Sequence, residues 1–286
     1  MGTDMLDRRL NAYRDDLADA RLAGRVTAAR FVEGEARRVR APLAPLRRAP
    51  RDDAPLETQA LMGEAVRVFE TDGNGWCFAQ LEDDAYVGYL PASALGPLGE
   101  APTHVVRVNQ TFLFPGPDIK RPPLATLPLG ARLGIVGEAS DRNATYALVA
   151  GGGAVVVQHL AGTGPSEADA VETALGFLGT PYLWGGKSAL GIDCSGLVQV
   201  ALGRAGIAAP RDADLQERDL GTPVPAGEAP RRGDLVFWPG HVGLMLDETR
   251  LLHANAFHMM TAIEPLAEAS ARMAARGVAL RSVRRL

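Results

Sequence analysis

The sequence predicts an α+β protein in which β-rich segments precede a domain made of helices and then an antiparallel sheet. Short β-runs broken by turn residues occupy residues 57–160, and the pattern changes to helical spacing from about residue 166. Three strand-like runs, DLVFW, HVGLMLD and RLLHANA, then follow the helices. With 286 residues, the chain is long enough to bury several apolar cores.

Residues 1–56 are expected to form a helix and then an extended arm. Four leucines fall at roughly helical spacing, namely Leu6, Leu10, Leu17 and Leu22. They predict one amphipathic helix over residues 1–35, which Gly24 could terminate. A Pro/Arg-rich arm is expected from there to residue 56.

Residues 57–98 and 99–162 are each expected to form a small β-barrel. In the first, AVRVFE, GWCFAQLE and AYVGYLP suit strands, and TDGNG and EDD suit the turns between them. The second repeats this rhythm with THVVRV, TFLF, ARLGIVGEA, ATYALVA and AVVVQHL. Cys77 lies in a strand of the first region and is expected to pack inside it.

Residues 163–286 are expected to form the α+β domain. A capping box that begins at Ser166 predicts the start of a helix running to Leu178. A second helix is expected to begin near Asp193 and to close at Gly206. Four of its side chains are expected to face inward, namely Leu197, Val198, Ala201 and Leu202.

Composition excludes several classes of function. The net charge is −4 and no basic tract stands out, so we expect no nucleic-acid partner. Two cysteines imply no disulfide framework. The N-terminal residues lack the apolar segment of an export signal, and no run of about 18 apolar residues occurs. We therefore expect a soluble, cytoplasmic protein without a membrane partner, and a monomer.

Cys194 has the features of a catalytic nucleophile. It lies in the first turn of a predicted helix, where unpaired amides and the helix dipole favour a thiolate and lower the thiol pKa. Its own amide would be available to an oxyanion. A buried structural cysteine is the alternative, but a position between Asp193 and Ser195 is a poor one for a core residue.

Two histidines on a predicted hairpin supply a base and a partner for it. Alternation places His241 and Gly243 on one face of a strand, and His253 and Asn255 on one face of the next. An odd number of loop residues would put both histidines on the same side, opposite each other with five and diagonal with three. His253 would then fix the tautomer of His241, which acts as the general base.

A metal site is the competing chemical interpretation. Zinc sites need several ligands at regular spacing, and Cys194 has no partner in a CxxC or HxxxH pattern. We therefore expect neither a metal nor an organic cofactor.

The segments GTPYLWGGKSALGIDCSGLV, PRDADLQ, RRGDLVFW, HVGLML and LLHA, in this order, resemble the NlpC-type family of bacterial cell-wall peptidases. The resemblance covers residues 166–286 and implies a papain-like fold. The two β-regions before it resemble bacterial SH3 domains. Together they resemble intracellular members that recycle muropeptides. Those members cut the bond between γ-D-glutamate and a diamino acid, either meso-diaminopimelate or lysine, in short murein peptides with a free N-terminal L-Ala.

The resemblance also assigns roles to residues. It implies that Cys194 is the nucleophile, His241 the base and His253 the orienting residue, with the hydroxyl of Tyr182 near the oxyanion. For substrate binding it implies Asp193, Ser195, Asp212 and Trp184, together with Glu64 and Tyr86 from the first SH3-like region. Asp212, with Glu64, would meet the substrate's ammonium group. Asp212 could instead cap a helix, and Glu64 could be a turn residue.

Two rival functions remain open. The same thiol chemistry would suit an amidase or an acyltransferase. A non-catalytic protein that binds wall peptides through its SH3-like regions is the other rival, and the intact set of Cys194, His241 and His253 argues against it.

Overall fold

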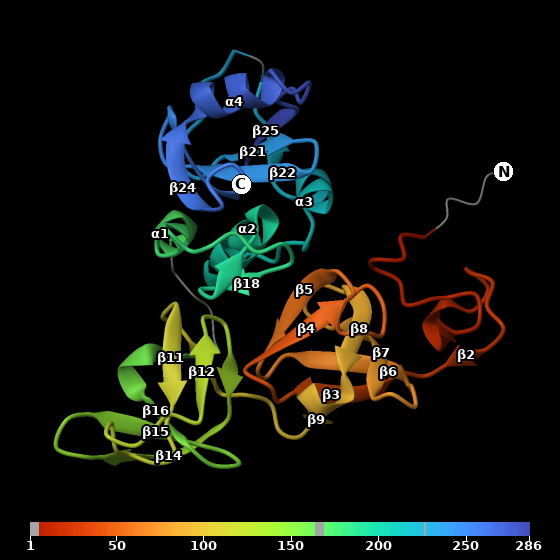
Figure 1. Ribbon diagram of the computed structural model, residues 1–286, viewed down its shortest axis with the longest axis vertical. Coiled ribbons are helices and arrows are strands. Elements are labelled where there is room, and N and C mark those ends of the chain that lie inside the picture. Colours follow the sequence, from red (N-terminus) through yellow and green to blue (C-terminus); the bar gives the residue numbers. More distant parts are fainter. Residues whose placement is uncertain (1–5, 164–168, 226) are drawn as a thin grey trace. The chain divides into compact units, whose positions relative to one another are not determined.

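The computed structural model describes residues 6–163, 169–225 and 227–286 (Figure 1). The chain forms two compact units, Met1–Thr163 and Gly164–Leu286, called here the N-terminal and C-terminal units. The capping box predicted at Ser166 lies outside the described residues, although Asp169 itself caps the first helix of the C-terminal unit.

Within the described part, no helix has the length and apolar character needed to span a bilayer.

The predicted N-terminal helix is wrong. The described residues before Glu35 form only β1 (Ala18–Asp19), the 3₁₀ turn η1 (Ala20–Leu22) and β2 (Phe31–Val32). The leucines do not share one stripe: Leu17 packs with Phe69 and Phe78, whereas Leu22 packs with other residues of the N-terminal segment. Leu10 packs against a third cluster, the core of the first β-region, so the helical spacing of the leucines arose from three separate apolar clusters.

The predicted Pro/Arg-rich arm is also wrong, because it supplies strands to the first β-region. That region is one seven-stranded sheet in the order β5-β4-β8-β7-β6-β3-β9. Its strands are β3 (Glu35–Val39), β4 (Leu43–Arg47), β5 (Leu56–Leu61), β6 (Ala65–Thr71), β7 (Trp76–Leu81), β8 (Val87–Pro91) and β9 (Leu95–Pro97), with a 3₁₀ turn η2 (Ala92–Ala94) before the last. Ala44 and Leu46 are buried in alternation along β4, a period-two signal that the neighbouring prolines and arginines obscured.

The first β-region encloses an apolar core to which Cys77 belongs, as predicted. The second β-region has a different design, with three small sheets around a core of its own. Its elements are β10 (His104–Val106), β11 (Gln110–Leu113), β12 (Ala125–Pro128), β13 (Arg132–Leu133), β14 (Ile135–Ser140), β15 (Thr145–Val149), β16 (Ala154–Val156), η3 (Val157–His159) and β17 (Leu160–Gly162).

The C-terminal unit has the predicted order of helices followed by an antiparallel sheet. Helices α1 (Ala170–Leu175), α2 (Cys194–Arg204) and α3 (Ala213–Asp219) come first, with the small hairpin β18 (Lys187–Ser188) and β19 (Gly191–Ile192) before α2. A six-stranded sheet and α4 (Leu266–Ala274) follow, the strands being β20 (Thr222–Pro223), β21 (Leu235–Trp238), β22 (His241–Met245), β23 (Arg250–Asn255), β24 (Met260–Pro265) and β25 (Ser282–Arg285).

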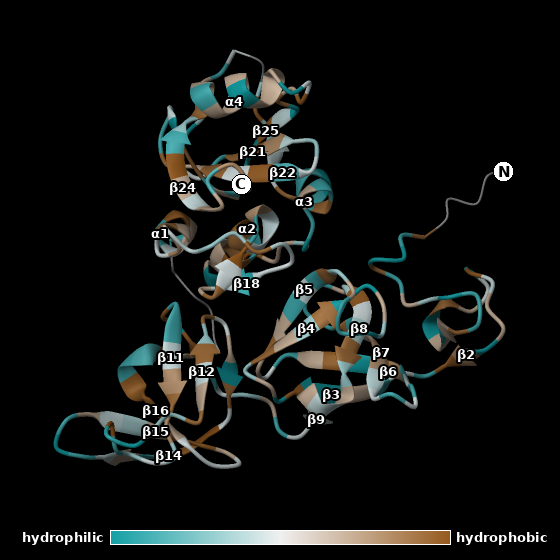
Figure 2. Ribbon diagram, in the orientation of Figure 1, coloured by the Kyte–Doolittle hydropathy of each residue, from teal (hydrophilic) through white to brown (hydrophobic). Residues whose placement is uncertain are grey.

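Both faces of this sheet are covered, which explains why its central strands β21, β22 and β23 are buried over nearly their whole length. In Figure 1, α4 lies on one side of the sheet, and α1 and α2 lie on the other. Helix α4 packs on Val236, Trp238, Met245 and Leu251, and α2 contacts β22 and β23. Figure 2 shows hydrophilic and hydrophobic residues mixed along α4, and Ala269 is the one buried in the apolar cluster shared with the sheet. The four inward side chains predicted for α2 are all buried. The first helix ends at Leu175 and does not run to Leu178 as predicted, and Leu178 is 53% exposed.

Candidate active site

Cys194 is the first residue of α2 and is 7% exposed. Backbone hydrogen bonds from Val242 and Ser195 reach its sulfur. Since Val242 directly follows His241 on β22, the sulfur lies at the strand end that carries the predicted base. The start of the helix and the start of the strand therefore meet at the thiol.

The helix begins at Cys194 because Asp193 caps it. One Asp193 carboxylate oxygen accepts from the amide of Gly196 at 2.7 Å, and the other accepts from the amide of Gly185 at 2.8 Å. Gly196 has no substitute here, because a Cβ at this position would lie 2.3 Å from the carbonyl oxygen of Gly186. The DCSG segment thus allows the backbone of residues 185–186 to lie directly against the first turn of α2.

Arg211 completes this support and was missed in the sequence analysis. Its side chain is 1% exposed, and its guanidinium donates to both carboxylate oxygens of Asp193, at 3.0 and 2.6 Å. It also donates to the hydroxyl of Ser195 at 2.8 Å. Asp193 and Ser195, expected to bind substrate, are held together by this buried arginine. Its position in the PRDAD segment was the only signal in the sequence.

The two histidines meet as the three-residue loop predicts. The amide of Leu246 donates to the carbonyl of Arg250, which leaves residues 247–249 as the loop. The pairing of Leu244 with Leu252 then places His241 and His253 diagonally on one face. His241 Nε2 lies 2.8 Å from His253 Nδ1.

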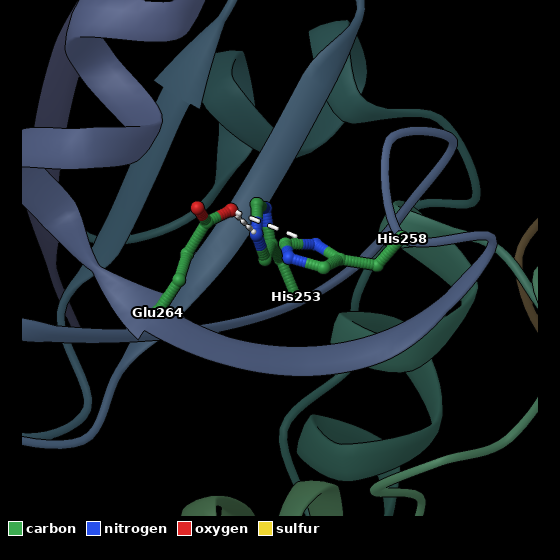
Figure 3. A group of neighbouring side chains, drawn as sticks. All are labelled: His253, His258 and Glu264. Atoms are coloured by element: carbon green, nitrogen blue, oxygen red, sulfur yellow. Dashed lines mark hydrogen bonds and ion pairs between the residues drawn. The ribbon is translucent and has the colours of Figure 1, made fainter.

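Glu264 extends this pair, and the sequence analysis missed it as well. His253 Nε2 lies 2.7 Å from Glu264 Oε1, and both side chains are buried. Arg272 of α4 donates to both oxygens of Glu264. Figure 3 shows the Glu264 carboxylate directed at the His253 ring, with His258 beside it. Three neighbouring strands therefore contribute one polar side chain each to a single buried row.

His253, His258 and Glu264 are close enough to suit a metal ion, since their ligand atoms lie within 4.8 Å of one another. The hydrogen bonds present give these atoms other partners. Both ring nitrogens of His253 are engaged, and the Arg272 guanidinium already neutralises Glu264. A second cation beside that guanidinium would be repelled, so the cluster suits a proton network better than a metal.

Burial controls the charge state of the catalytic pair. It raises the pKa of the Cys194 thiol to about 12, and the charge of Asp193 acts in the same direction. It lowers the pKa of His241 to about 3 and that of His253 to about 4. We expected the helix start to lower the thiol pKa, but burial outweighs the amide donors. Because burial penalises a lone charge on either group, the thiolate and the imidazolium have to form together, by transfer of one proton.

Tyr182 is near enough to Cys194 for the charge of the thiolate to act on its hydroxyl, and its role at the oxyanion stays a prediction. Burial raises the pKa of its hydroxyl, and the charges of Cys194 and Asp193 raise it further, so the hydroxyl remains a donor. The amide of Tyr182 donates to the carbonyl of Met259 at 2.9 Å, which ties this segment to the turn before β24. Trp184, two residues on, is 62% exposed.

Asp212 occupies the N-cap position of α3, yet among the described residues its side chain makes no capping hydrogen bond. Asp212 is thus at a capping position, but its carboxylate does not cap the helix. Glu64 and Tyr86 belong to the N-terminal unit, and their contribution to the site stays a prediction. Tyr86 is 2% exposed, and its hydroxyl lies 3.5 Å from Glu57.

Residues 179–276 match the NlpC/P60 family, and residues 46–95 match the bacterial dipeptidyl-peptidase SH3 domain. The C-terminal unit is an NlpC/P60 domain. This family is one of cysteine peptidases, which agrees with Cys194 and its histidine pair. The SH3 match begins before residue 57, in agreement with the strands found in the supposed arm.

Similar proteins match different lengths of this chain. A dipeptidyl-peptidase 6 from Lysinibacillus sphaericus is 48% identical over 87 residues, which span 30% of this chain and 31% of that protein. A gamma-D-glutamyl-L-lysine dipeptidyl-peptidase from Bacillus cereus is 27% identical over 241 residues, covering 74% of this chain and 71% of the relative. The crystal structure of an NlpC/P60 family protein from Bacillus cereus covers 88% of this chain and 99% of its own, with a TM-score of 0.72 at 22% identity. That last likeness establishes a shared fold.

Proposed function

We propose that this protein is a cysteine endopeptidase that hydrolyses the bond between γ-D-glutamate and an L-diamino acid in short murein peptides. The diamino acid would be meso-diaminopimelate or lysine, and the peptide would begin with a free L-Ala. The observation that carries the proposal is the junction of Cys194 with the His241–His253 pair in an NlpC/P60 domain. The names of relatives that act on γ-D-glutamyl-L-lysine bonds support the choice of bond.

The reaction uses the groups that meet at the thiol. The Cys194 sulfur attacks the γ-glutamyl carbonyl carbon while its proton passes to His241, so that a C–S bond forms. The Cys194 amide and the Tyr182 hydroxyl stabilise the oxyanion. Collapse breaks the C–N bond, and the proton moves from His241 to the leaving amine. His241 then deprotonates water, which hydrolyses the thioester and releases the dipeptide and the free thiol.

A panel of four peptides tests this proposal. The purified full chain is incubated with L-Ala-γ-D-Glu followed by either meso-diaminopimelate or L-lysine, each with a free or an acetylated N-terminus, and products are followed by mass spectrometry. We expect L-Ala-γ-D-Glu and the free diamino acid from at least one unblocked peptide and far slower cleavage of the blocked ones. Cleavage at another bond, or transfer to an added amine in place of hydrolysis, would favour the amidase or acyltransferase alternative.

Asp212 is proposed to pair with the substrate ammonium group. Asp212→Asn should lower kcat/KM for the unblocked peptide roughly 30-fold or more, the kinetic equivalent of about 2 kcal/mol for losing one partner of a charge pair. The acetylated peptide should lose far less. Asp214→Asn, two residues further along the same helix, is the matched control. Equal losses on both peptides would remove Asp212 from this role.

We also propose that the enzyme works as a cytoplasmic monomer in the recycling of murein peptides. A requirement for a free amine would select short released peptides over intact wall, which fits that setting. Light scattering of the full chain and fractionation of cells that express it test the two parts of this proposal. A stable dimer, or recovery outside the cytoplasm, would contradict them.

A further inference from the structure

A row of four side chains leads away from the nucleophile, and its last two members, Glu264 and Arg272, have no part in the reaction proposed above. His241 Nε2 lies 2.8 Å from His253 Nδ1, and His253 Nε2 lies 2.7 Å from Glu264 Oε1. Arg272 closes the row by donating to both Glu264 oxygens. Glu264 is 7% exposed and His253 is fully buried, so these hydrogen bonds are sheltered from water.

Glu264 is ionised in this setting. Burial alone would raise its pKa, but hydrogen bonds from Arg272 and His253 hold that pKa below the ordinary value. An ionised carboxylate accepts hydrogen bonds and cannot donate one. Because a hydrogen bond needs one proton between its two heavy atoms, the proton between Glu264 and His253 belongs to His253 Nε2.

This single assignment decides the rest of the row. A neutral imidazole carries one proton, so His253 Nδ1 is left with a lone pair. The contact between His253 Nδ1 and His241 Nε2 then requires the proton on His241 Nε2. His241 Nδ1 in turn is left with a lone pair, and it is the ring nitrogen available to the thiol.

We propose that Glu264, held by Arg272, is a positioning residue that locks both histidines in the tautomer in which His241 Nδ1 is the base. The proposal rests on the proposed thiol chemistry for its catalytic meaning. Its claim about proton positions does not depend on any substrate.

Without the Glu264 charge, the row also has a reversed arrangement. His253 would carry its proton on Nδ1 and donate to His241 Nε2, so the remaining proton of His241 would lie on Nδ1. That nitrogen could no longer accept the thiol proton. A glutamine at residue 264 permits both arrangements, since its amide offers a donor and an acceptor in nearly the same shape.

Nitrogen NMR of the full chain tests the proposal directly. Long-range ¹⁵N–¹H spectra distinguish protonation at Nδ1 from protonation at Nε2, and the chain has only five histidines to assign. In the unaltered protein at neutral pH we expect Nε2–H on both His241 and His253. A proton on Nδ1 of either ring would overturn the proposal, whatever the activity.

The variant Glu264→Gln should shift both rings to a mixture of tautomers. If the proposed function holds, kcat should fall about 10²-fold, within the range for general acid–base catalysis, with KM changed less than about twofold. Glu264→Asp, which restores a carboxylate, should recover part of the loss. Glu268→Gln, an exposed acid on the same helix as Arg272, is the control and should change neither the tautomers nor kcat.

A folded Glu264→Gln variant with the original tautomers would overturn the proposal. If the tautomers change as expected but the unaltered protein cleaves no murein peptide, the proposed function fails while the proton assignment stands. If the variant does not fold, the positions of the protons on His241 and His253 in the unaltered protein are enough to test the proposal.

Discussion

Two carboxylate–arginine pairs, each with a buried carboxylate, stand on either side of the catalytic junction, and they perform different tasks. Asp193 and Arg211 support the nucleophile, with side chains 9% and 1% exposed. Glu264 and Arg272 support the base, with side chains 7% and 20% exposed. The first pair binds backbone amides and a hydroxyl, so it fixes where the helix begins. The second binds an imidazole, so it fixes where a proton lies.

The same kind of ion pair can therefore fix either the position of the backbone or the position of a proton. Which of the two it fixes depends on the groups that donate hydrogen bonds to its carboxylate. Amides and hydroxyls near Asp193 keep their protons at every physiological pH. The histidine next to Glu264 exchanges a proton between two ring nitrogens, so only this pair can influence the chemistry of the base. Substitutions in the Asp193–Arg211 pair should therefore lower mainly the free energy of unfolding. Substitutions in the Glu264–Arg272 pair should change mainly the histidine tautomers and kcat.

The largest expected effect on stability comes from Arg211→Met. Removing it leaves the Asp193 carboxylate buried without its counter-charge, which should cost about 3–5 kcal/mol of unfolding free energy. Urea unfolding of the full chain measures this loss. Arg231→Met, which breaks an exposed pair with Glu228, should cost less than about 1 kcal/mol. Equal losses in the two variants would remove the structural role given to Arg211.

An intermediate effect on the free energy of unfolding is expected when the pH is lowered. The pKa values of His241 and His253 are lowered in the fold to about 3 and about 4, so the unfolded chain binds more protons as pH falls below about 6.5. Stability contributed by the neutral rings is complete above that pH and is lost toward pH 4. Each ring should contribute a slope of about 1.4 kcal/mol per pH unit within this window.

Urea unfolding at pH 6.5, 6 and 5 measures that slope. His253→Asn removes one of the two titrating rings and should reduce the slope by about half. An unchanged slope in this variant, or a gain in stability as pH falls, would contradict the burial-driven shifts.

The smallest expected effect comes from Arg272→Met. Its guanidinium is partly exposed, so its loss should cost about 1–2 kcal/mol of unfolding free energy, less than the loss at Arg211. The effect on kcat should nevertheless exceed that of any surface substitution, because Glu264 loses the group that holds it. A greater loss of unfolding free energy in Arg272→Met than in Arg211→Met would contradict the different roles given to the two pairs.

The sequence predicted the parts of the site that depend on local patterns. A helix starting at Cys194 and two histidines on one hairpin face follow from spacing along the chain, and both are confirmed. Arg211 and Glu264 were missed because each acts across a gap in sequence. Glu264 reaches His253 only through the pairing of β23 with β24, and no pattern in the sequence fixes that register.

The failures in the N-terminal unit have a different physical origin. Leucine spacing near the N-terminus matched a helix, but the side chains pack into three separate clusters, which a one-dimensional period cannot separate. The strands around residues 35–47 were hidden by prolines and arginines. Their sheet partners made these segments strands, and tertiary pairing of that kind overrides local propensity.

The central claim, that Cys194 acts as the nucleophile, is tested most directly with the chain's two cysteines. Cys194→Ala and Cys77→Ala each remove one thiol, the second from the core of the first β-region. Both variants are incubated with the tripeptide that the full chain cleaves fastest, and dipeptide release is followed by mass spectrometry. We predict that Cys77→Ala retains most of the activity and that Cys194→Ala releases no dipeptide above the uncatalysed rate. Dipeptide release by folded Cys194→Ala at a rate near that of Cys77→Ala would contradict the account.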